Sequence, residues 1–242
     1  MTRRRWIADE WSESSAVLRD AQAAHLARVL RAQVGQEFDI VAGDAVRRGV
    51  VEQVQTDAVY FSLYEDLEAA ATLPLTIVLA IIRFERMEWA IEKLTELGVS
   101  RIAPLCAARS EKHLVQAAMK RAGRWRRIAR EAAQQSRRDD VPEIADPSAL
   151  SDWVAAEPDC LRLSLSEHRR VTSLRTWMGT TLASKQASPI LAAIGPEGGW
   201  TEKELASFAA NGWQPVSLGP RILRAETAAI ALTSALSAWL GS

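Results

Sequence analysis

The pattern of hydrophobic and polar residues changes near position 70. Before it, short alternating segments predict strands over 37–41, 49–55 and 58–63, with a turn at 42–44. His25, Leu26, Val29 and Leu30 lie at helical spacing and predict one short helix among these strands. The first 70 residues are therefore expected to form a small β-rich domain.

A different pattern begins after the segment 65–74, which is the expected domain boundary. Residues 75–82 are continuously apolar, which is typical of a strand buried on both faces, and 86–97 reads as an amphipathic helix that ends at Gly98. Strands and helices then alternate: strands at 99–105, 160–165, 189–194 and 215–218, and helices at 117–137, 171–184, 202–210 and 226–240. This alternation predicts an α/β domain over 75–242, with a mostly parallel sheet and helices on both faces.

Composition narrows the class of protein. The chain has 242 residues, 48% of them hydrophobic, and 30 Lys and Arg balance 30 Asp and Glu. The zero net charge argues against a uniformly basic nucleic-acid binder. It conceals one strongly basic window, because residues 120–138 carry eight basic residues and one acidic residue, a net charge of +7, and the rest of the chain sums to −7.

Within this window, helical spacing puts Trp125 and Ala129 on a core stripe and leaves Arg126, Arg130 and Arg137 on a solvent face. Arg3, Arg4 and Arg5 form a second basic patch at the start of the chain. A basic helix face is also common on surfaces that contact only solvent. At this point the basic face is therefore compatible both with RNA binding and with simple exposure to solvent.

Other features argue against whole classes of function. The start of the chain has no apolar segment of the signal-peptide kind, and the longest apolar runs, 78–82 and 190–194, are far shorter than the ~20 residues of a membrane span. Cys106 and Cys160 make no disulfide framework, which favours a reduced cytoplasm. The three histidines at 25, 113 and 168 are scattered, and we expect no metal site.

Two loops that follow predicted strands carry the candidate chemistry. Residues 195–201 read Gly-Pro-Glu-Gly-Gly-Trp-Thr, where glycines let backbone amides approach a ligand and Thr201 can cap the next helix. Residues 219–228 bring two arginines and a Glu-Thr pair to the start of the last helix. Ligands of parallel sheets bind beyond the carboxyl ends of strands. Taken singly, the first loop also fits a tight turn and the second a surface ion-pair network, and neither matches a dinucleotide or P-loop motif.

Taken together, the two loops resemble the signature motifs of the ribosomal RNA small subunit methyltransferase E family, the 16S rRNA uracil-N3 methyltransferases of the SPOUT superfamily. Further stretches agree with this family along nearly the whole chain: 25–31, 92–99, 102–105, 109–110, 135–138 and 141–144. The chain departs from the family pattern at Arg83-Phe84-Glu85, where Lys-Gly-Asp is usual, and at Ser136-Arg137-Arg138, where Ser-Gly-Arg is usual.

The resemblance implies a PUA-like RNA-binding β-barrel over 1–70, and a SPOUT methyltransferase domain over 75–242 that is tied in a deep trefoil knot. It implies a homodimer acting on 16S rRNA of the small ribosomal subunit in the cytoplasm, with S-adenosylmethionine as cofactor and no metal or membrane. The implied cofactor-binding residues are Gly195, Pro196, Glu197, Gly198, Gly199, Leu218, Gly219, Ile222, Leu223, Thr227 and Ala228. The implied RNA-binding residues are Arg3, Arg4, Arg5, His25, Arg28, Arg31, Arg126, Arg130, Arg137 and Arg138.

Uracil N3 attacks a methyl group only after it loses its proton, so the site needs a base or cations that stabilise the anion. Glu197 and Glu226 are the candidate carboxylates, and Arg224 and Arg138 of the partner subunit are the candidate cations. The sequence does not decide between them. Two other functions stay open: a non-catalytic RNA-binding or ribosome-assembly factor with this fold, and a related knotted methyltransferase acting on tRNA or on a ribose 2′-oxygen.

Overall fold

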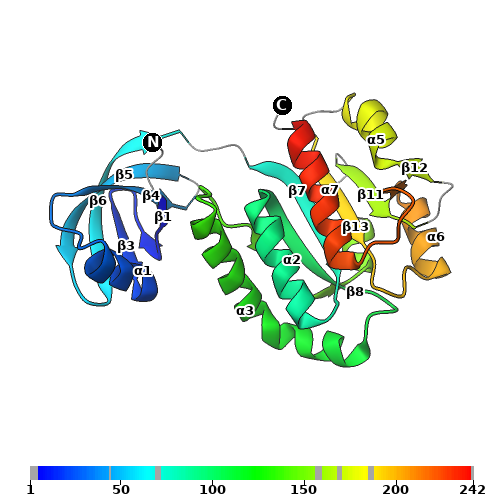
Figure 1. Cartoon of the computed structure of the whole chain (residues 1–242), viewed down its shortest axis with the longest axis horizontal. Coiled ribbons are helices and arrows are strands. Elements are labelled where there is room, and N and C mark those ends of the chain that lie inside the picture. The colour runs from blue at the N-terminus through cyan, green and yellow to red at the C-terminus, as the bar shows by residue number, and fades with distance from the viewer. Residues whose placement is uncertain are drawn as a thin grey trace. The chain divides into compact units, whose positions relative to one another are not determined.

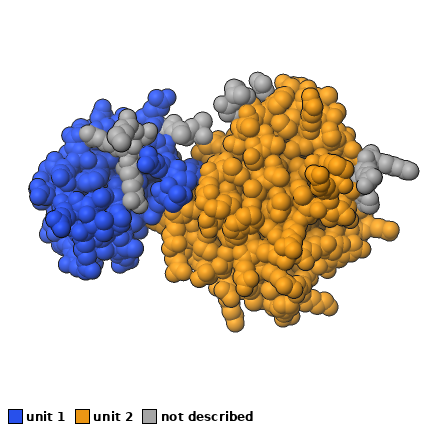
Figure 2. Space-filling model, viewed as in Figure 1, with its two compact units in different colours: residues 1–71, 133–141 blue, residues 72–132, 142–242 orange. Residues whose placement is uncertain are grey.

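The protein divides into two compact units. The computed structural model describes residues 5–43, 45–68, 72–155, 160–167, 171–184 and 188–240. Unit 1 comprises residues 1–71 and 133–141, and unit 2 comprises 72–132 and 142–242 (Figure 2). The short segment 133–141 therefore belongs with the first unit, although the sequence pattern gives no break between it and the preceding helix.

Unit 1 is built on a mostly antiparallel sheet. Its strands are β1 (Arg5–Ile7), β2 (Glu10–Trp11), β3 (Ser15–Arg19), β4 (Glu37–Ala42), β5 (Ala45–Val54) and β6 (Ala58–Leu67), in the order β1-β4-β5-β6-β3-β2. Among its described strands, the β1 and β4 pair runs parallel and the other pairs are antiparallel. The three predicted strands are confirmed as β4, β5 and β6, whereas β1 to β3 were not predicted. Asp44 of the predicted turn lies outside the described residues.

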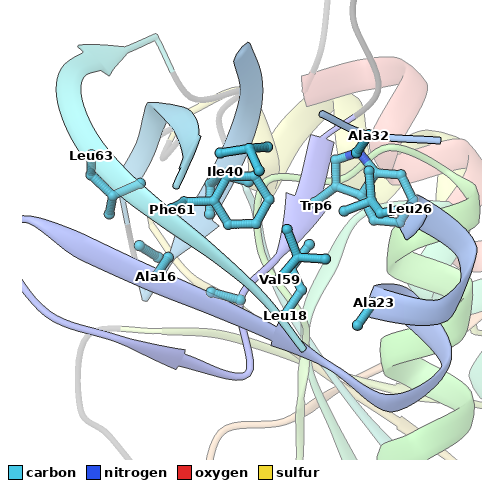
Figure 3. Packing of buried hydrophobic residues seen from close by; sticks show 13 residues of the cluster. Trp6, Ala16, Leu18, Ala23, Leu26, Ala32, Ile40, Val59, Phe61 and Leu63 are labelled. Carbon is cyan, nitrogen blue, oxygen red and sulfur yellow. The ribbon is translucent and has the colours of Figure 1, made fainter. Parts of the chain in front are cut away.

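One helical segment covers this sheet. Helix α1 (Asp20–Ala24) continues into the π-helix η1 (His25–Val29), and α1 packs on β3 and β6. Figure 3 shows the enclosed core, in which Trp6 of β1 lies close to Leu26 of η1 and Phe61 lies beside Ile40. The side chains of this core come from the two helical segments, α1 and η1, and from strands β1, β3, β4, β5 and β6. Their burial supplies the hydrophobic stabilisation of the unit.

The segment 133–141 joins unit 1 through packing and charge. Ala133 is buried against Ile7, Val41 and Val46 in a separate small cluster. Asp139 is 5% exposed and forms an ion pair with Arg5. A charge buried to this extent is stable only with its partner, so Arg5 is part of the packing of this unit.

Unit 2 contains a parallel sheet. Its strands are β7 (Leu73–Ala80), β8 (Val99–Cys106), β9 (Glu143–Ile144), β10 (Ser148–Ala149), β11 (Leu161–Leu165), β12 (Thr172–Ser173), β13 (Ile190–Ile194) and β14 (Gln214–Ser217). Their order is β10-β8-β7-β13-β11-β14-β12, with β9 beside β8, and each pairing among the described strands is parallel. The predicted α/β domain with a mostly parallel sheet is confirmed.

Helices cover both faces of this sheet. They are α2 (Phe84–Glu96), α3 (Lys112–Gln135), α4 (Ser151–Val154), α5 (Leu174–Trp177), the π-helix η2 (Met178–Leu182), α6 (Glu202–Ala210) and α7 (Ala225–Leu240). Helices α2 and α7 lie side by side over one face (Figure 1). On the other face, Trp153, Phe208 and Trp213 pack against alternate residues of β7, β8 and β13. The helix expected over 171–184 is confirmed only in part, because Thr172–Ser173 form strand β12 and the helical residues are those of α5 and η2. Among the described residues, no helix is long and apolar enough to cross a membrane.

Candidate functional site

A cavity of about 260 Å³ lies beyond the carboxyl ends of three neighbouring strands in unit 2. The loops that follow β11, β13 and β14 form its walls, together with the start of α7 and one residue from the loop after β8. Its lining residues are Arg109, Leu165, Ser166, Glu167, Ile194, Gly195, Pro196, Glu197, Gly199, Trp200, Leu205, Ser217, Leu218, Gly219, Arg221, Ile222, Leu223, Ala225 and Ala228. This edge is where parallel sheets place their ligands.

The loop 195–199 depends on glycine for its path. Gly199 has a φ of +68°, a backbone conformation that side-chain-bearing residues rarely adopt. A Cβ at Gly195 would lie 3.0 Å from the Trp200 ring, and the Trp200 indole N–H donates to the Leu165 carbonyl at 3.2 Å. The glycines therefore bring the backbone close to both the tryptophan and the cavity.

Arg109 supports this loop from the loop after β8. Its guanidinium donates to the carbonyl oxygens of Gly198, at 2.8 Å, and Trp200, at 3.2 Å. A Cβ at Gly198 would lie 3.3 Å from the Arg109 Cβ, so the glycine also leaves room for the arginine stem. The two carbonyls face Arg109, which fixes the orientation of the peptide groups between them.

Helix α6 begins immediately after this loop with the predicted cap at Thr201, which is confirmed. Thr201 and Glu204 form a complete capping box, in which each side chain accepts from the other residue's backbone N–H. Glu204 is 8% exposed and also accepts a 2.9 Å hydrogen bond from the backbone N–H of Ala108. One buried carboxylate thus fixes both the start of α6 and the loop after β8.

The second loop, 219–224, leads into α7. Ala225 and Ala228 of this helix line the cavity, whereas Glu226 is turned away and its side chain is 6% exposed. Arg86 of α2 forms ion pairs with Glu226, at 3.7 Å, and with Glu197 of the first loop. Ile222 is 80% exposed, so part of this wall presents an apolar side chain to solvent.

The structure brings most of the sequence-predicted cofactor residues to one cavity. Those that line it are Gly195, Pro196, Glu197, Gly199, Leu218, Gly219, Ile222, Leu223 and Ala228, whereas Gly198 and Thr227 do not. Sequence reasoning missed Leu165, Ser166 and Glu167. No motif marks them, but their position at the carboxyl end of a predicted strand could have identified them.

The four catalytic candidates lie in different surroundings. Glu197 lines the cavity, with a side chain that is 54% exposed, and Glu226 is buried against Arg86. Arg224 is exposed and is not a lining residue. Arg138 belongs to unit 1, where its guanidinium donates to both carboxylate oxygens of Asp140 at 3.0 and 2.7 Å. Of the four, only Glu197 reaches the cavity wall in this chain.

Acidic partners neutralise much of the basic helix α3. Arg124 donates twice to Glu88 of α2, at 2.6 and 2.8 Å, and this bonding raises the pKa of Arg124 above its ordinary value. Arg126 pairs with Asp146 at 2.5 Å. Arg127 lies 3.7 Å from Glu131, and Arg130 is half-buried. The excess charge of the window 120–138 is therefore partly balanced by acids distant in sequence.

Unit 1 holds the remaining predicted RNA contacts. Arg28 and Arg31 are exposed at the end of η1, and Arg31 has a φ of +52°. The His25 ring lies 5.7 Å from the Trp6 ring, between centroids. Arg137, at the position where the family pattern has glycine, is exposed and has a φ of +60°. Arg3 and Arg4 lie outside the described residues, and Arg5 is the partner of Asp139.

The described residues contain no cluster of three or more His, Cys, Asp or Glu side chains that could hold a metal ion. Among the described residues, the charged ones that line the cavity are Glu167, Glu197, Arg109 and Arg221.

Comparison with known proteins identifies the class to which this fold and site belong. A family model described as an RNA methyltransferase domain matches residues 69–237, which include every described strand of the parallel sheet and all the residues that line the cavity. The parallel-sheet unit is thus an RNA methyltransferase domain.

Relatives that match beyond this domain define the family. Ribosomal RNA small subunit methyltransferase E of Synechocystis is 36% identical over 95% of this chain and 75% of the relative, and that of Bacillus subtilis is 30% identical over 88% and 86%. The crystal structure of such an enzyme from Neisseria gonorrhoeae, bound to S-adenosyl methionine, matches with a TM-score of 0.81 at 27% identity over 98% of each chain. The chain belongs to the ribosomal RNA small subunit methyltransferase E family.

Proposed function

We propose that this protein transfers a methyl group from S-adenosylmethionine to N3 of a specific uridine in 16S rRNA of the small ribosomal subunit. The observation that carries the proposal is the cavity at the carboxyl edge of the parallel sheet, walled by the two loops that resemble the family motifs. The solved relative from Neisseria gonorrhoeae has S-adenosyl methionine bound, which supports the same cofactor here.

The cavity residues fit this cofactor. Leu165, Ile194, Leu218 and Leu223 give apolar walls for an adenine ring, and Ser166 and Glu167 offer polar groups to the ribose and amino-acid parts. The path of the loop at Gly195 and Gly199 exposes backbone that a side chain would cover. A volume of about 260 Å³ lies just below the roughly 300–1,000 Å³ typical of small-molecule pockets.

The bound cofactor would supply an activated methyl group on a sulfonium. The work of the chain is then to hold the nucleophile in line with that methyl group, since correct orientation removes much of the barrier of a bimolecular reaction. Arg109, Glu204 and the capped start of α6 hold the first loop in place before any ligand binds. A wall that is already ordered loses little entropy on binding.

Uracil N3 must also lose its proton. Two arginines sit on the second loop, of which Arg221 lines the cavity and Arg224 is exposed next to it. We infer that this loop supplies the positive charge that stabilises the uracil anion, because Glu197 is already paired with Arg86 and Glu226 does not reach the cavity. Arg138 of the partner subunit is a further candidate cation in a homodimer.

The finer features that the family implies are part of the proposal. Unit 1 would be a PUA-like RNA-binding barrel, unit 2 a SPOUT domain with a deep trefoil knot, and the working form a homodimer in the cytoplasm. The exposed Arg28 and Arg31 suit contacts with RNA phosphates, and the target uridine must leave its base stack to reach the cavity.

The test is nucleoside mass spectrometry of 16S rRNA from a strain that lacks this gene. We expect N3-methyluridine to disappear from 16S rRNA and to return when the gene is restored. Unchanged N3-methyluridine would defeat the proposed reaction. Loss of a modified nucleoside from tRNA, or of a ribose 2′-O-methyl group, would assign the protein to a different knotted methyltransferase.

A further inference from the structure

One arginine outside the cavity links the loop after β13 to the start of α7. Arg86 lies in the first turn of α2, and its terminal nitrogen donates to Glu197 Oε1 in the loop after β13. Its Nε lies 3.7 Å from Glu226 Oε1, at the start of α7 and directly after the second loop. The same guanidinium therefore meets a carboxylate from each loop region.

The two carboxylates differ in burial, which makes the link asymmetric. The Glu226 side chain is 6% exposed, and its Oε2 atom is buried without a hydrogen-bond partner among the described residues. The Glu197 side chain is 54% exposed. Buried charges are retained only when they are paired, so Glu226 anchors Arg86 between α2 and α7. Arg86 can then hold the exposed side chain of Glu197 at a fixed place on the cavity wall.

The shape of the guanidinium suits this task. It is planar and presents donors in several fixed directions, whereas a lysine ammonium is a compact point charge on a flexible stem. Arg86 is also 26% exposed in its side chain, so solvent screens it only partly. Arg109, in the loop after β8, donates to the carbonyls of Gly198 and Trp200. Arg86 and Arg109 therefore hold the first loop at two points.

We propose that Arg86 is a positioning residue that sets the spacing of the two cavity loops, 195–199 and 219–224. It acts through Glu197 in the first loop and through Glu226 of α7, which directly follows the second loop. This proposal rests on the proposed function, since it takes S-adenosylmethionine as the ligand of the cavity. Arg86 itself is not among the lining residues, so its effect on binding is indirect.

The experiment is calorimetric titration of S-adenosylmethionine into the full-length protein. Arg86→Gln is expected to raise the Kd about tenfold, within the range measured for coupled members of one ion-pair network. Glu197→Gln should give a similar rise. The double variant Arg86→Gln/Glu197→Gln should be no weaker than either single variant, because both changes break the same link. Arg86→Lys should recover part of the affinity.

Arg124→Gln is the matched control. Arg124 also bonds to a glutamate of α2, Glu88, but it is not a lining residue of the cavity. The Kd of Arg124→Gln for S-adenosylmethionine should therefore equal that of the wild type. Because Arg86→Gln leaves Glu226 buried without its cation, the neutral variant Arg86→Gln/Glu226→Gln is made as well. This double variant should fold, which thermal unfolding will check. It should still bind S-adenosylmethionine about tenfold more weakly than the wild type.

The outcomes separate the two proposals. A wild-type protein that binds no S-adenosylmethionine overturns the proposed function itself. A wild type that binds, with unchanged Kd in the folded Arg86 variants, overturns only the role of Arg86. A double variant weakened about a hundredfold, the product of two independent losses, would also overturn that role, because Arg86 and Glu197 would then act separately.

Discussion

The first cavity loop, 195–199, and helix α3 both have arginine contacts with segments far away in the chain. The two regions differ in how much of their structure the sequence reveals. In the loops, glycines at 195, 198 and 199 fix the local path, and Arg109 and Arg86 hold it from outside. On α3, the arginines look free in the sequence, but Arg124 and Arg126 pair with acids 36 and 20 residues away. A short sequence motif thus predicts the local backbone path, whereas the net charge of a surface depends on partners that are distant in the sequence.

The largest expected effect is at Gly199. Gly199→Arg puts a long side chain at a residue that lines the cavity, and we expect S-adenosylmethionine affinity to fall by more than about 100-fold. Gly212→Arg is the control, because Gly212 also has a positive φ of +74° but its Cβ position is open and it does not line the cavity. Both variants should fold equally well in thermal unfolding. Unchanged affinity in Gly199→Arg would remove the loop from the cofactor site.

A second test concerns the buried carboxylate that holds the loops. Glu204→Ala removes the capping box and the bond to the Ala108 N–H, and it should lower the free energy of unfolding by about 2 kcal/mol. Glu202→Ala, in the same first turn of α6 but exposed, should change it by less than about 0.5 kcal/mol. Urea unfolding measures both, and equal losses would show that Glu204 has no special role.

The third test compares helix α3 with unit 1 as sources of RNA affinity. Arg28→Gln and Arg31→Gln remove exposed cations and should each weaken binding to small-subunit rRNA about three- to tenfold, with a salt slope smaller by about one. Arg124→Gln removes a cation already bonded to Glu88 and should change affinity by less than about twofold. Filter binding over a series of salt concentrations gives both values. The reverse ranking would mean that α3 is the main RNA surface despite its pairing.

The smallest effect is expected at Arg137. Its φ of +60° is strained for a residue with a side chain, so Arg137→Gly should raise the free energy of unfolding by about 0.5–1 kcal/mol. Gln116→Gly, at an exposed position inside α3, should lower it by about 1 kcal/mol. Thermal unfolding at one pH compares the two. A loss of stability in Arg137→Gly would mean that the contacts of the Arg137 side chain outweigh the strain.

Much of unit 2 could be predicted from the sequence because its signals are local. The apolar run at 75–82, the helix over 202–210 and the cap at Thr201 follow from periodicity and capping chemistry. The two loops could be placed at one edge of the sheet because the carboxyl ends of parallel strands share an edge.

Other features depend on contacts between distant segments. The pairing of β1 with β4 and the place of 133–141 in unit 1 leave no periodic signal, because short strands and a single buried Asp139 are fixed only by their partners. The third wall of the cavity, at Leu165 to Glu167, has no glycine or motif to mark it. Nothing in the sequence distinguishes Arg86 from other helix residues, because its role depends on its contacts with Glu197 of the first loop and Glu226 of α7.

The most direct test of the proposed reaction is methyl transfer by the purified protein. Small ribosomal subunits from a strain lacking this gene are incubated with the protein and S-adenosylmethionine carrying a labelled methyl group, and the 16S rRNA is then digested to nucleosides. We expect about one labelled methyl group per subunit, on N3 of uridine, and none with Gly199→Arg. Label on another nucleoside, or equal labelling by Gly199→Arg, would contradict the proposed reaction.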